Sequence, residues 1–535
     1  MMRNRYFQQA CVFVALETLA GCGGGGGSGS NAVPIVTGPA PTPTLAVTLS
    51  APSADVNVDE GQTATFGFVA SYSGASTQPI VPNVTIGGKR YALEGTPTAS
   101  GNGFAVSLKT ASFAPGGKAS STVTFRLCTS ADCATVYPGS TASYTVNLDV
   151  RLKDWGTAQR DAAHSGYVAV KYTTADFADA WNVAGTPSAR TSQIAARRGS
   201  IFFNVQSVQG GTNHVLTRAL NTATGAQAWE YDLGQRSYFS APSYANGRVI
   251  SAAMDISSGN IPMDVIDADK GSYLRSLFYP SQFATSGTPT PLDDNIYHAA
   301  GYYGNEAFAY DAAAGTRQWV ANTLPFGSGI VQEGESVAVD SKFVYFFTAG
   351  RLFALSRTNG SIAHAIDNPF FSRAGVSYFG TYVGAPMLDG TGRVFTFSDN
   401  RGGGQALPLV AFSINSDSVL WRTSRSYVGD PALRAGKLYA IRANSAIVDL
   451  IDAADGTVTA SIDLGTDKGI LTNNLVLTES HLFVSSDNAT YAIDLQQPTY
   501  PVVWSTQHGG SLAITPDNLL VVTQKAGGIY GYRLN

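Results

Sequence analysis

The chain has few charged side chains, since Asp, Glu, Lys and Arg make up 13% of its 535 residues, about half of the roughly 25% that is typical. Helices need Glu, Lys and Arg on their exposed faces, whereas the abundant Gly, Tyr and Phe suit short strands and tight turns. Lys and Arg number 34 and form no cluster, so the basic surface on which nucleic-acid binding depends is missing. We therefore expect an all-β fold and no nucleic-acid partner.

Long apolar runs are also missing, because no later window has the roughly 20 consecutive apolar residues of a membrane-spanning helix. Residues 1–22 instead have the features of a targeting segment: a positive start at Arg3 and Arg5, an apolar stretch over 10–16, and Leu-Ala-Gly-Cys ending at Cys22. This ending resembles the bacterial lipobox. The resemblance implies cleavage before Cys22 and acylation of its thiol, and a plain secretion signal is the alternative.

Two acyl chains would anchor the protein stably to a lipid surface. Gly23 follows the cysteine, where an Asp would stand in lipoproteins kept at the inner membrane. By resemblance to lipoprotein sorting, this residue implies transfer to the outer membrane.

Cysteine is scarce, with four residues in all, and none lies after Cys133. Cys128 and Cys133 are separated by four residues, and in an oxidising compartment such a pair most simply closes a small disulfide loop near a hairpin. A metal site is the alternative, but neither a neighbouring His nor a second Cys pair accompanies these residues. We expect a disulfide and no metal.

The residues that follow the targeting segment divide the chain further. Residues 23–44 begin with a glycine run and end in a Pro/Thr stretch, a composition that predicts a flexible tether. Residues 45–150 show short alternating strands separated by turn residues, a rhythm that predicts a β-sandwich. This region resembles bacterial immunoglobulin-like modules, which implies a spacer, although it has no Cys…Trp…Cys pattern.

Residues 151–535 carry an internal repeat. Each copy contains a strand, an Asp-like turn that ends in Gly, and a second strand with an aromatic residue near its start. The turn residues are Gly225, Gly271, Gly315, Gly360, Asp417 and Gly456. A period of about 45 residues made only of strands and turns is typical of a four-stranded propeller blade.

The repeat also predicts how the ring closes. The last half-copy, residues 529–534, supplies a third strand, and residues 177–183 can supply the missing outer strand of the same blade. Seven full copies and this shared blade predict an eight-bladed β-propeller. Strands from the two ends of the region would then leave no open radial edge.

The D-x-x-x-G-x-x-x-W spacing and the stretch 154–167 resemble the tryptophan-docking repeat of pyrroloquinoline quinone (PQQ)-type propellers, over residues 154–535. The resemblance implies that the tryptophan of each blade stacks beside a turn of the neighbouring blade. The tryptophans at this place are Trp181, Trp229, Trp319, Trp421 and Trp504. Arg275, His364 and Ala460 occupy it in the other blades.

This family includes PQQ-dependent dehydrogenases as well as non-catalytic scaffolds, such as the propeller lipoprotein of the outer-membrane barrel-assembly machine. A dehydrogenase needs an aromatic floor for the quinone, a Ca²⁺ held by Glu, Asn and Asp, and an Asp base. Glu333 or Glu335 with Asn400 and Asp430 are the candidate Ca²⁺ ligands. The vicinal cysteine pair of the alcohol-oxidising members is missing here.

Three hypotheses for the function follow. The favoured one is a monomeric, non-catalytic envelope lipoprotein that binds a protein partner and needs no cofactor. The alternatives are a PQQ dehydrogenase and a surface protein that binds glycan or matrix through Tyr302, Tyr303 and the aromatic stretch 378–382. An aromatic funnel floor with convergent carboxylates would favour chemistry, and a narrow, plugged or plainly solvated channel would favour docking.

Overall fold

The computed structural model describes residues 42–185, 189–254, 259–281, 287–300, 306–321, 336–371, 381–382, 385–398, 401–402 and 406–535. These residues form strands and turns, with two short 3-10 helices, η1 (Thr174–Asp176) and η2 (Thr466–Lys468). The prediction of an all-β fold is therefore confirmed. Within these ranges, no helix has the length and apolar character needed to cross a bilayer.

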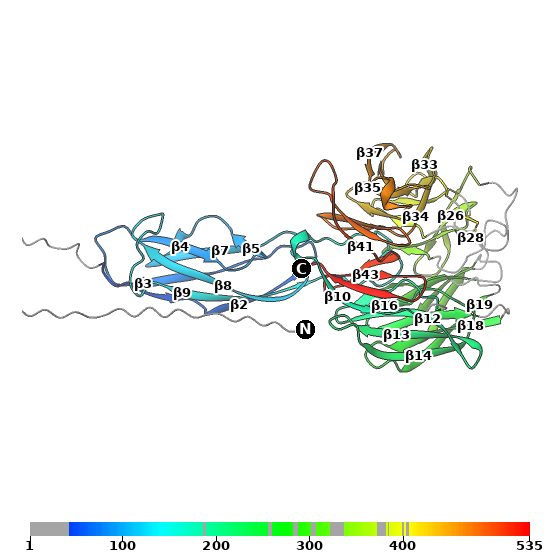
Figure 1. Ribbon diagram of the computed structural model, residues 1–535, viewed down its shortest axis with the longest axis horizontal. Helices are drawn as coiled ribbons and strands as arrows, with labels where there is room; N and C mark the ends of the chain where they lie inside the picture. The colour runs from blue at the N-terminus through cyan, green and yellow to red at the C-terminus, as the bar shows by residue number, and fades with distance from the viewer. Residues whose placement is uncertain are drawn as a thin grey trace, which may run out of the picture.

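The chain forms two bodies (Figure 1). The N-terminal body is elongated and extends away from the broader C-terminal body, which holds the remaining strands. Cys22, the targeting segment and most of the expected tether lie outside the described residues.

The N-terminal body consists of two facing sheets. Sheet A contains β1 (Ala46–Leu49), β3 (Thr65–Ser73), β7 (Gly103–Thr110), β5 (Tyr91–Leu93) and the short β6 (Thr98–Ala99). Sheet B contains β2 (Ser53–Asp59), β9 (Ala142–Arg151), β8 (Gly117–Cys128) and β4 (Val81–Ile86), and β2 pairs with β9 in parallel.

Alternate residues of these strands point into a shared core, as expected for sheets that face solvent on one side. Phe68 of sheet A lies between two rings of sheet B, with its centroid 4.5 Å from that of Tyr144 and 6.2 Å from that of Phe125. Aromatic burial of this kind holds the two sheets together.

The C-terminal body contains eight larger antiparallel sheets within the described ranges, and we number them in chain order. Sheet 1 is β11 (Ala195–Arg197), β12 (Ser200–Gln209), β13 (Thr212–Asn221) and β14 (Gln227–Gln235). Sheet 2 is β16 (Ser243–Ala245), β17 (Arg248–Met254), β18 (Gly259–Asp267) and β19 (Tyr273–Ser281), with β15 (Tyr238–Phe239) also on β17. Sheet 3 is β20 (Thr290–Leu292), β21 (Asn295–Ala300), β22 (Glu306–Asp311) and β23 (Thr316–Ala321). Sheet 4 is β24 (Ala338–Val339), β25 (Phe343–Phe347), β26 (Arg351–Ser356) and β27 (Ile362–Asp367).

The second half of this body repeats the pattern. Sheet 5 is β29 (Met387–Leu388), β30 (Arg393–Phe397), β32 (Leu409–Ser413) and β33 (Ser418–Arg422). In the same part of the chain, β28 (Thr381–Tyr382) and β31 (Arg401–Gly402) form a separate two-stranded sheet. Sheet 6 is β34 (Tyr427–Arg434), β35 (Lys437–Arg442), β36 (Ile447–Asp452) and β37 (Val458–Asp463). Sheet 7 is β38 (Val476–Leu477), β39 (His481–Ser485), β40 (Thr490–Asp494) and β41 (Val502–Thr506). Sheet 8 is β42 (Ser511–Ile514), β43 (Leu519–Thr523), β44 (Ile529–Arg533) and β10 (Ala178–Val183).

Each sheet packs face to face against the next one through its own apolar core. Phe202 of sheet 1, for example, stacks on Tyr244 of sheet 2 with ring centroids 5.5 Å apart. Similar clusters lie between sheets 2 and 3, 3 and 4, 4 and 5, 5 and 6, and 6 and 7. A further cluster joins sheets 7, 8 and 1, so the series of packed sheets returns to its start.

The two ends of the C-terminal body meet in sheet 8. β10 precedes sheet 1 in the sequence, yet it pairs antiparallel with β44, from Ala178 opposite Arg533 to Val183 opposite Ile529. The expectation that residues 177–183 complete the last sheet is confirmed. This pairing covers the edge that β44 would otherwise expose.

Candidate functional site

Residues 155–170, which we call the belt, hydrogen-bond to seven successive sheets. The contacts of the belt are Trp155 N to Ala196 O (2.9 Å), Tyr244 N to Gly156 O (2.8 Å), Thr157 Oγ1 to Pro289 O (2.8 Å), Val339 N to Ala162 O (2.7 Å), Leu388 N to Ala163 O (3.0 Å), Leu433 N to Ser165 O (2.8 Å) and Leu477 N to Gly166 O (2.8 Å). Each partner lies in or beside the first strand of its sheet.

A segment of this length spans at most about 55 Å when fully extended. It reaches seven sheets only because their first strands surround it. The belt therefore fills the centre at which the sheets converge.

The belt buries polar residues and gives them partners. The side chain of Gln159 donates to Pro431 O at 2.7 Å and accepts from Asn474 Nδ2 at 2.9 Å. His164 is fully buried, with its Nδ1 2.8 Å from Pro386 O, and burial lowers the pKa of its imidazole. Buried polar groups that are hydrogen-bonded in this way specify one arrangement of the backbone.

The belt also joins the two bodies. Arg160 forms an ion pair with Glu60, and both side chains are 4% exposed. The carboxylate of Glu60 accepts further hydrogen bonds from Ala169 N (2.7 Å) and Lys153 N (2.9 Å). Burial acts to raise the pKa of Glu60, but the charge and hydrogen bond of Arg160, together with the two backbone donors, hold it below its ordinary value.

A cavity of about 830 Å³, which we call the funnel, lies at one end of the sheets. Its described lining comes from loops that lead into the first strands and from turns between second and third strands. The lining residues are Arg190 to Gln193, Phe239 to Ala241, Thr288, Val428 to Asp430, Asn444, Ile470 to Asn474, Ser511 and Lys525. Gln159 of the belt bonds to Asn474 and to the backbone oxygen of Asp430, so the belt lies directly beneath this lining.

The N-terminal body is attached at the opposite end of the sheets. Asn518, in the turn between β42 and β43, exchanges two hydrogen bonds of 2.8 Å with the backbone of Gly116. Arg198, in the turn between β11 and β12, donates to Asp149 at 3.1 Å. In an antiparallel sheet, such turns lie at the other end from the loop that leads into the first strand. The funnel therefore opens on the face turned away from the N-terminal body.

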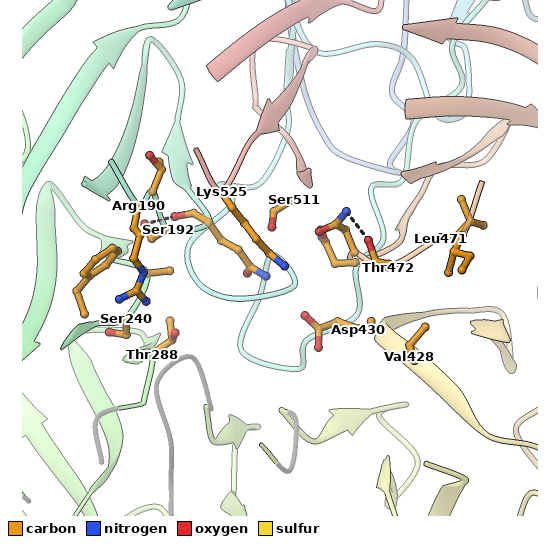
Figure 2. A pocket seen from close by; sticks show the side chains of 18 of the residues that line it. Arg190, Ser192, Ser240, Thr288, Val428, Asp430, Leu471, Thr472, Ser511 and Lys525 are labelled. Atoms are coloured by element: carbon orange, nitrogen blue, oxygen red, sulfur yellow. Dashed lines mark hydrogen bonds between the residues drawn. The ribbon is translucent and has the colours of Figure 1, made fainter. Parts of the chain in front are cut away.

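Three charged side chains lie in the described lining of the funnel: Arg190, Lys525 and Asp430. The guanidinium carbon of Arg190 lies 5.2 Å from the centroid of the Phe239 ring. In Figure 2, Lys525 extends between Arg190 on one side and Asp430 on the other. The described lining thus contains two cationic side chains and one carboxylate.

The tryptophans of the repeat lie between neighbouring sheets. In four of them the indole Nε1 donates to a carbonyl in the turn before the last strand of the next sheet. These bonds are Trp181 to Thr222 O (2.7 Å), Trp229 to Ala268 O (3.0 Å), Trp319 to Arg357 O (3.0 Å) and Trp421 to Ala453 O (3.2 Å). The turn glycine lies against the indole in each case, so that a Cβ built on Gly271 would meet Trp229 at 2.6 Å.

The remaining sheets use other side chains at this place. Arg275 donates to Ala313 O, and His364 Nδ1 lies 2.6 Å from a carboxylate oxygen of Asp417. Trp504 faces the closing sheet, where no continuous turn exists, and packs edge-on against Tyr532 with ring centroids 5.1 Å apart. Ala460 has no group that could replace the indole hydrogen bond.

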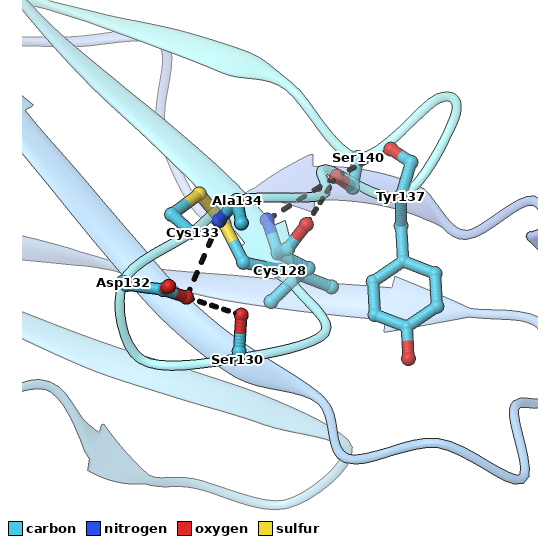
Figure 3. The surroundings of a disulfide bond; sticks show 8 residues. Cys128, Ser130, Asp132, Cys133, Ala134, Tyr137 and Ser140 are labelled. Atoms are coloured by element: carbon cyan, nitrogen blue, oxygen red, sulfur yellow. Dashed lines mark hydrogen bonds between the residues drawn. A yellow bond between two sulfur atoms is a disulfide. The ribbon is translucent and has the colours of Figure 1, made fainter.

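Cys128 and Cys133 form a disulfide in the N-terminal body, with Cα atoms 5.0 Å apart (Figure 3). Cys128 ends β8, whose first residue, Gly117, lies beside the C-terminal body. The disulfide is thus at the far end of the N-terminal body. Asp132 and Ser130 share a hydrogen bond within the small loop that the disulfide closes.

Most of the candidate ligands of the alternative hypotheses lie outside the described residues, namely Glu333, Glu335, Asn400, Tyr302, Tyr303 and residues 378–380. Asp430 lies in the funnel lining. The described part of the chain brings together no group of three or more His, Cys, Asp or Glu residues able to hold a metal ion.

The repeat matches a known protein family. Residues 212–462 match the protein family described as outer membrane protein assembly factor BamB. Over these residues, the C-terminal body is similar to the PQQ-type β-propeller of BamB.

Two solved structures give the same general likeness. BamB from Moraxella catarrhalis has a TM-score of 0.48 and 12% identity, over 67% of this chain and 99% of that chain. The quinohemoprotein alcohol dehydrogenase ADHIIG from Pseudomonas putida HK5 has a TM-score of 0.48 and 12% identity, over 71% of this chain and 80% of that chain. No curated protein matches the chain.

Sequence reasoning missed the belt and, apart from Asp430, the residues of the funnel. The family resemblance of the stretch 154–167 says nothing of its path through the centre. Arg190 and Lys525 stand alone in loops, without a motif around them. A cluster of special backbone angles is what sets the belt apart, since Gln159, Arg160 and His164 all have positive φ, and the sequence gives no sign of it.

Proposed function

We propose that the chain is a lipid-anchored protein of the outer membrane whose propeller is a non-catalytic scaffold for a protein partner. One observation carries this proposal: the belt fills the centre of the sheets, and the funnel above it opens away from the N-terminal body. With the belt at the centre, the funnel offers a concave face that a partner can enter. The match of residues 212–462 to an assembly factor supports the same conclusion.

The finer architecture belongs to this proposal. We take the eight packed sheets of residues 151–535 as eight blades, with sheet 8 closed by β10 and β44. We take residues 45–150 as an immunoglobulin-like spacer, residues 23–44 as the tether and residues 1–22 as the segment cleaved before Cys22. The docking tryptophans and the Cys128–Cys133 disulfide then have structural roles, and the protein acts as a monomer.

A quinone cofactor fits the described lining of the funnel poorly. PQQ needs a flat aromatic floor and a Ca²⁺ with six to eight oxygen ligands, several of them carboxylates. The described lining contains one carboxylate, Asp430, and one aromatic ring, Phe239. These two residues come from sheets 6 and 2, which lie half a turn apart in a ring of eight.

A photo-crosslinking experiment tests the docking face. A crosslinking amino acid would replace Ile470, which lines the funnel and is 52% exposed, in the full chain expressed in its own cell envelope. The matched control is Val502, an aliphatic residue that is 36% exposed on β41, the last strand of sheet 7, into which the loop of Ile470 leads. We expect a discrete crosslinked protein from position 470 and none from position 502.

Equal crosslinking from both positions, or none from position 470, would contradict a funnel-face scaffold. Turnover of an alcohol or sugar by the purified chain with PQQ, Ca²⁺ and an artificial electron acceptor would instead establish the dehydrogenase alternative.

A further inference from the structure

We infer that the funnel binds an uncharged polar segment of a protein, whose amide groups pair with the buried hydroxyl groups of Thr191, Ser240 and Thr288. We call these three residues the hydroxyl wall. This inference rests on the proposed function and states the chemistry of the partner. It concerns hydrogen bonds between neutral groups, and it requires no cofactor.

The hydroxyl wall comes from three successive sheets. Thr191 precedes β11 of sheet 1, Ser240 precedes β16 of sheet 2, and Thr288 precedes β20 of sheet 3. All three residues line the funnel. Figure 2 shows Ser240 and Thr288 on one side of the cavity, across from Val428. A ligand in the funnel therefore meets hydroxyl groups along one side.

The hydroxyl groups of the wall are buried and lack partners. Ser240 and Thr288 are each 1% exposed, and the Oγ1 of Thr191 is also buried. Within the described part of the chain, neither the Oγ of Ser240 nor the Oγ1 atoms of Thr191 and Thr288 have a hydrogen-bond partner. A buried hydroxyl without a partner costs stability, so such groups in the wall of a cavity point to a ligand that supplies the missing bonds.

The buried polar side chains next to Ser240 are paired, by contrast. Asn204 is fully buried, and its Nδ2 donates to Ser240 O at 2.9 Å. The Oδ1 of Asn204 accepts hydrogen bonds from Thr217 Oγ1 (2.8 Å) and Ser251 Oγ (2.9 Å). This network fixes the backbone of Ser240, so its hydroxyl is ordered before a ligand arrives.

The chemistry of the wall suits an amide. A hydroxyl group both donates and accepts a hydrogen bond, and an amide offers both an N–H and a C=O. A carboxylate offers acceptors alone and an ammonium group donors alone, so neither would use both capacities of the wall. The funnel, at about 830 Å³, falls in the usual range of pockets for ligands of several hundred daltons.

A sugar also carries groups that donate and accept, but the rest of the lining favours a peptide. The described lining has one aromatic ring on which a sugar ring would stack, Phe239, and the guanidinium group of Arg190 already lies over it at 5.2 Å. Ile470 and Val428 instead offer an apolar surface to aliphatic side chains. A segment with amide groups beside an aliphatic residue would use both kinds of surface.

Photo-crosslinking from position 470 in the full chain tests the inference. Ser240→Ala and Thr288→Val each remove one hydroxyl with little change of shape. We expect each variant to lower the yield of the crosslinked protein about threefold to tenfold, as the loss of a neutral hydrogen bond does. The midpoint of thermal unfolding of the free chain should stay equal or rise, because neither hydroxyl loses a partner.

Ser251→Ala and Thr217→Val are the matched controls. These hydroxyl groups belong to fully buried residues and are hydrogen-bonded to Asn204. The control variants should lower the midpoint of unfolding and leave the crosslinking yield unchanged. The opposite responses of the two pairs separate a binding role from a structural one.

An unchanged yield in both Ser240→Ala and Thr288→Val would overturn the inference. A fall of their unfolding midpoints as large as that of the control pair would also overturn it, because the hydroxyl groups would then have structural partners. In both cases a protein adduct from the wild-type chain would leave the proposed function standing, and only the hydroxyl recognition would fail. A wild-type adduct that mass spectrometry identifies as glycan, or the absence of any adduct, would overturn the proposed function and the inference together.

Discussion

At the scale of single residues, the contacts that join neighbouring sheets depend on glycine. Gly271 has a φ of +67° and lies under the indole of Trp229, where a Cβ would stand 2.6 Å from the ring. Gly247 has a φ of +77° and open space around it. The positive φ would strain the backbone of an alanine at either position. Only at Gly271 would the added Cβ also clash with a tryptophan.

This comparison isolates the docking contact. We expect Gly247→Ala to lower the stability of the propeller by about 1 kcal/mol through its positive φ alone. Gly271→Ala should cost a further 1–3 kcal/mol or so, since the indole must move in a packed interface. The thermal midpoint of each variant, measured by calorimetry, gives the difference. Equal midpoints for the two variants would contradict the structural role of the tryptophan.

A buried histidine makes the stability of the folded chain depend on pH. His298 is fully buried against Tyr279, and burial lowers the pKa of its imidazole from its ordinary value of 6.5 to about 3. The unfolded chain therefore binds a proton below pH 6.5 that the folded chain does not take up until about pH 3. Stability falls as the pH drops through this interval, by up to about 1.4 kcal/mol per pH unit.

His298→Phe should remove the part of the pH dependence of stability that comes from this imidazole. Between pH 6 and pH 5, where most carboxylates stay charged, we expect the thermal midpoint of the wild-type chain to fall more steeply than that of the variant. Parallel curves in that window would show that His298 takes up its proton in the folded protein.

At the scale of elements, the belt is the feature that connects the two bodies to the funnel. Its neighbouring residues Gln159 and Arg160 point to different partners, the first to Asn474 under the funnel and the second to Glu60 of the N-terminal body. The free energy of this junction depends on an ion pair that is almost fully buried. Such a pair contributes little when replaced as a whole but costs much when one partner is removed.

Glu60→Gln tests the junction. Because the pKa of Glu60 is lowered in the folded chain, its carboxylate stabilises the fold above its unfolded pKa of about 4.3 and loses this effect as the pH falls through its folded pKa. At pH 7 the variant leaves Arg160 buried beside a neutral group, and we expect a loss of about 3–5 kcal/mol. The difference from wild type should shrink at pH 3.

Glu94→Gln is the control for this variant, since Glu94 pairs with Lys109 on the exposed face of sheet A. It should shift the thermal midpoint very little. A loss at Glu60 no larger than that at Glu94 would show that the buried pair does not hold the bodies together.

Sequence and structure agree best on the elements that have a local cause. The turn glycines and the tryptophans recur at a fixed spacing, so the repeat predicts the four-stranded sheets, and the half-copy at the end predicts the pairing of β10 with β44. The belt lacks such a cause. Its partners, from Ala196 to Leu477, lie far along the chain, and no local pattern distinguishes a buried Gln159 from one in an ordinary loop.

The funnel is hidden from the sequence for the same physical reason. Arg190, Asp430 and Lys525 line one cavity only because the series of packed sheets returns to its start. Each residue alone is typical of a solvated loop. Among the proposed Ca²⁺ ligands, only the position of Asp430 could be compared with the structure, and it lies in the funnel.

At the scale of the whole molecule, the two bodies are joined by several direct contacts. Glu60, Gly116 and Asp149 of the N-terminal body bond to the belt and to turns of sheets 8 and 1, so the junction is a set of buried and polar contacts on several strands. A tethered chain of this shape would present its funnel away from the membrane surface. The partner would then approach from the far side.

The central claim is that this far face, and no other, is the docking surface. Amide hydrogen exchange of the full chain, measured alone and with the protein crosslinked from position 470, tests this directly. We predict slower exchange over residues 190–193 and 470–474 and unchanged exchange in the turns at 293–294 and 341–342. Protection of those turns, with the funnel loops unchanged, would contradict it.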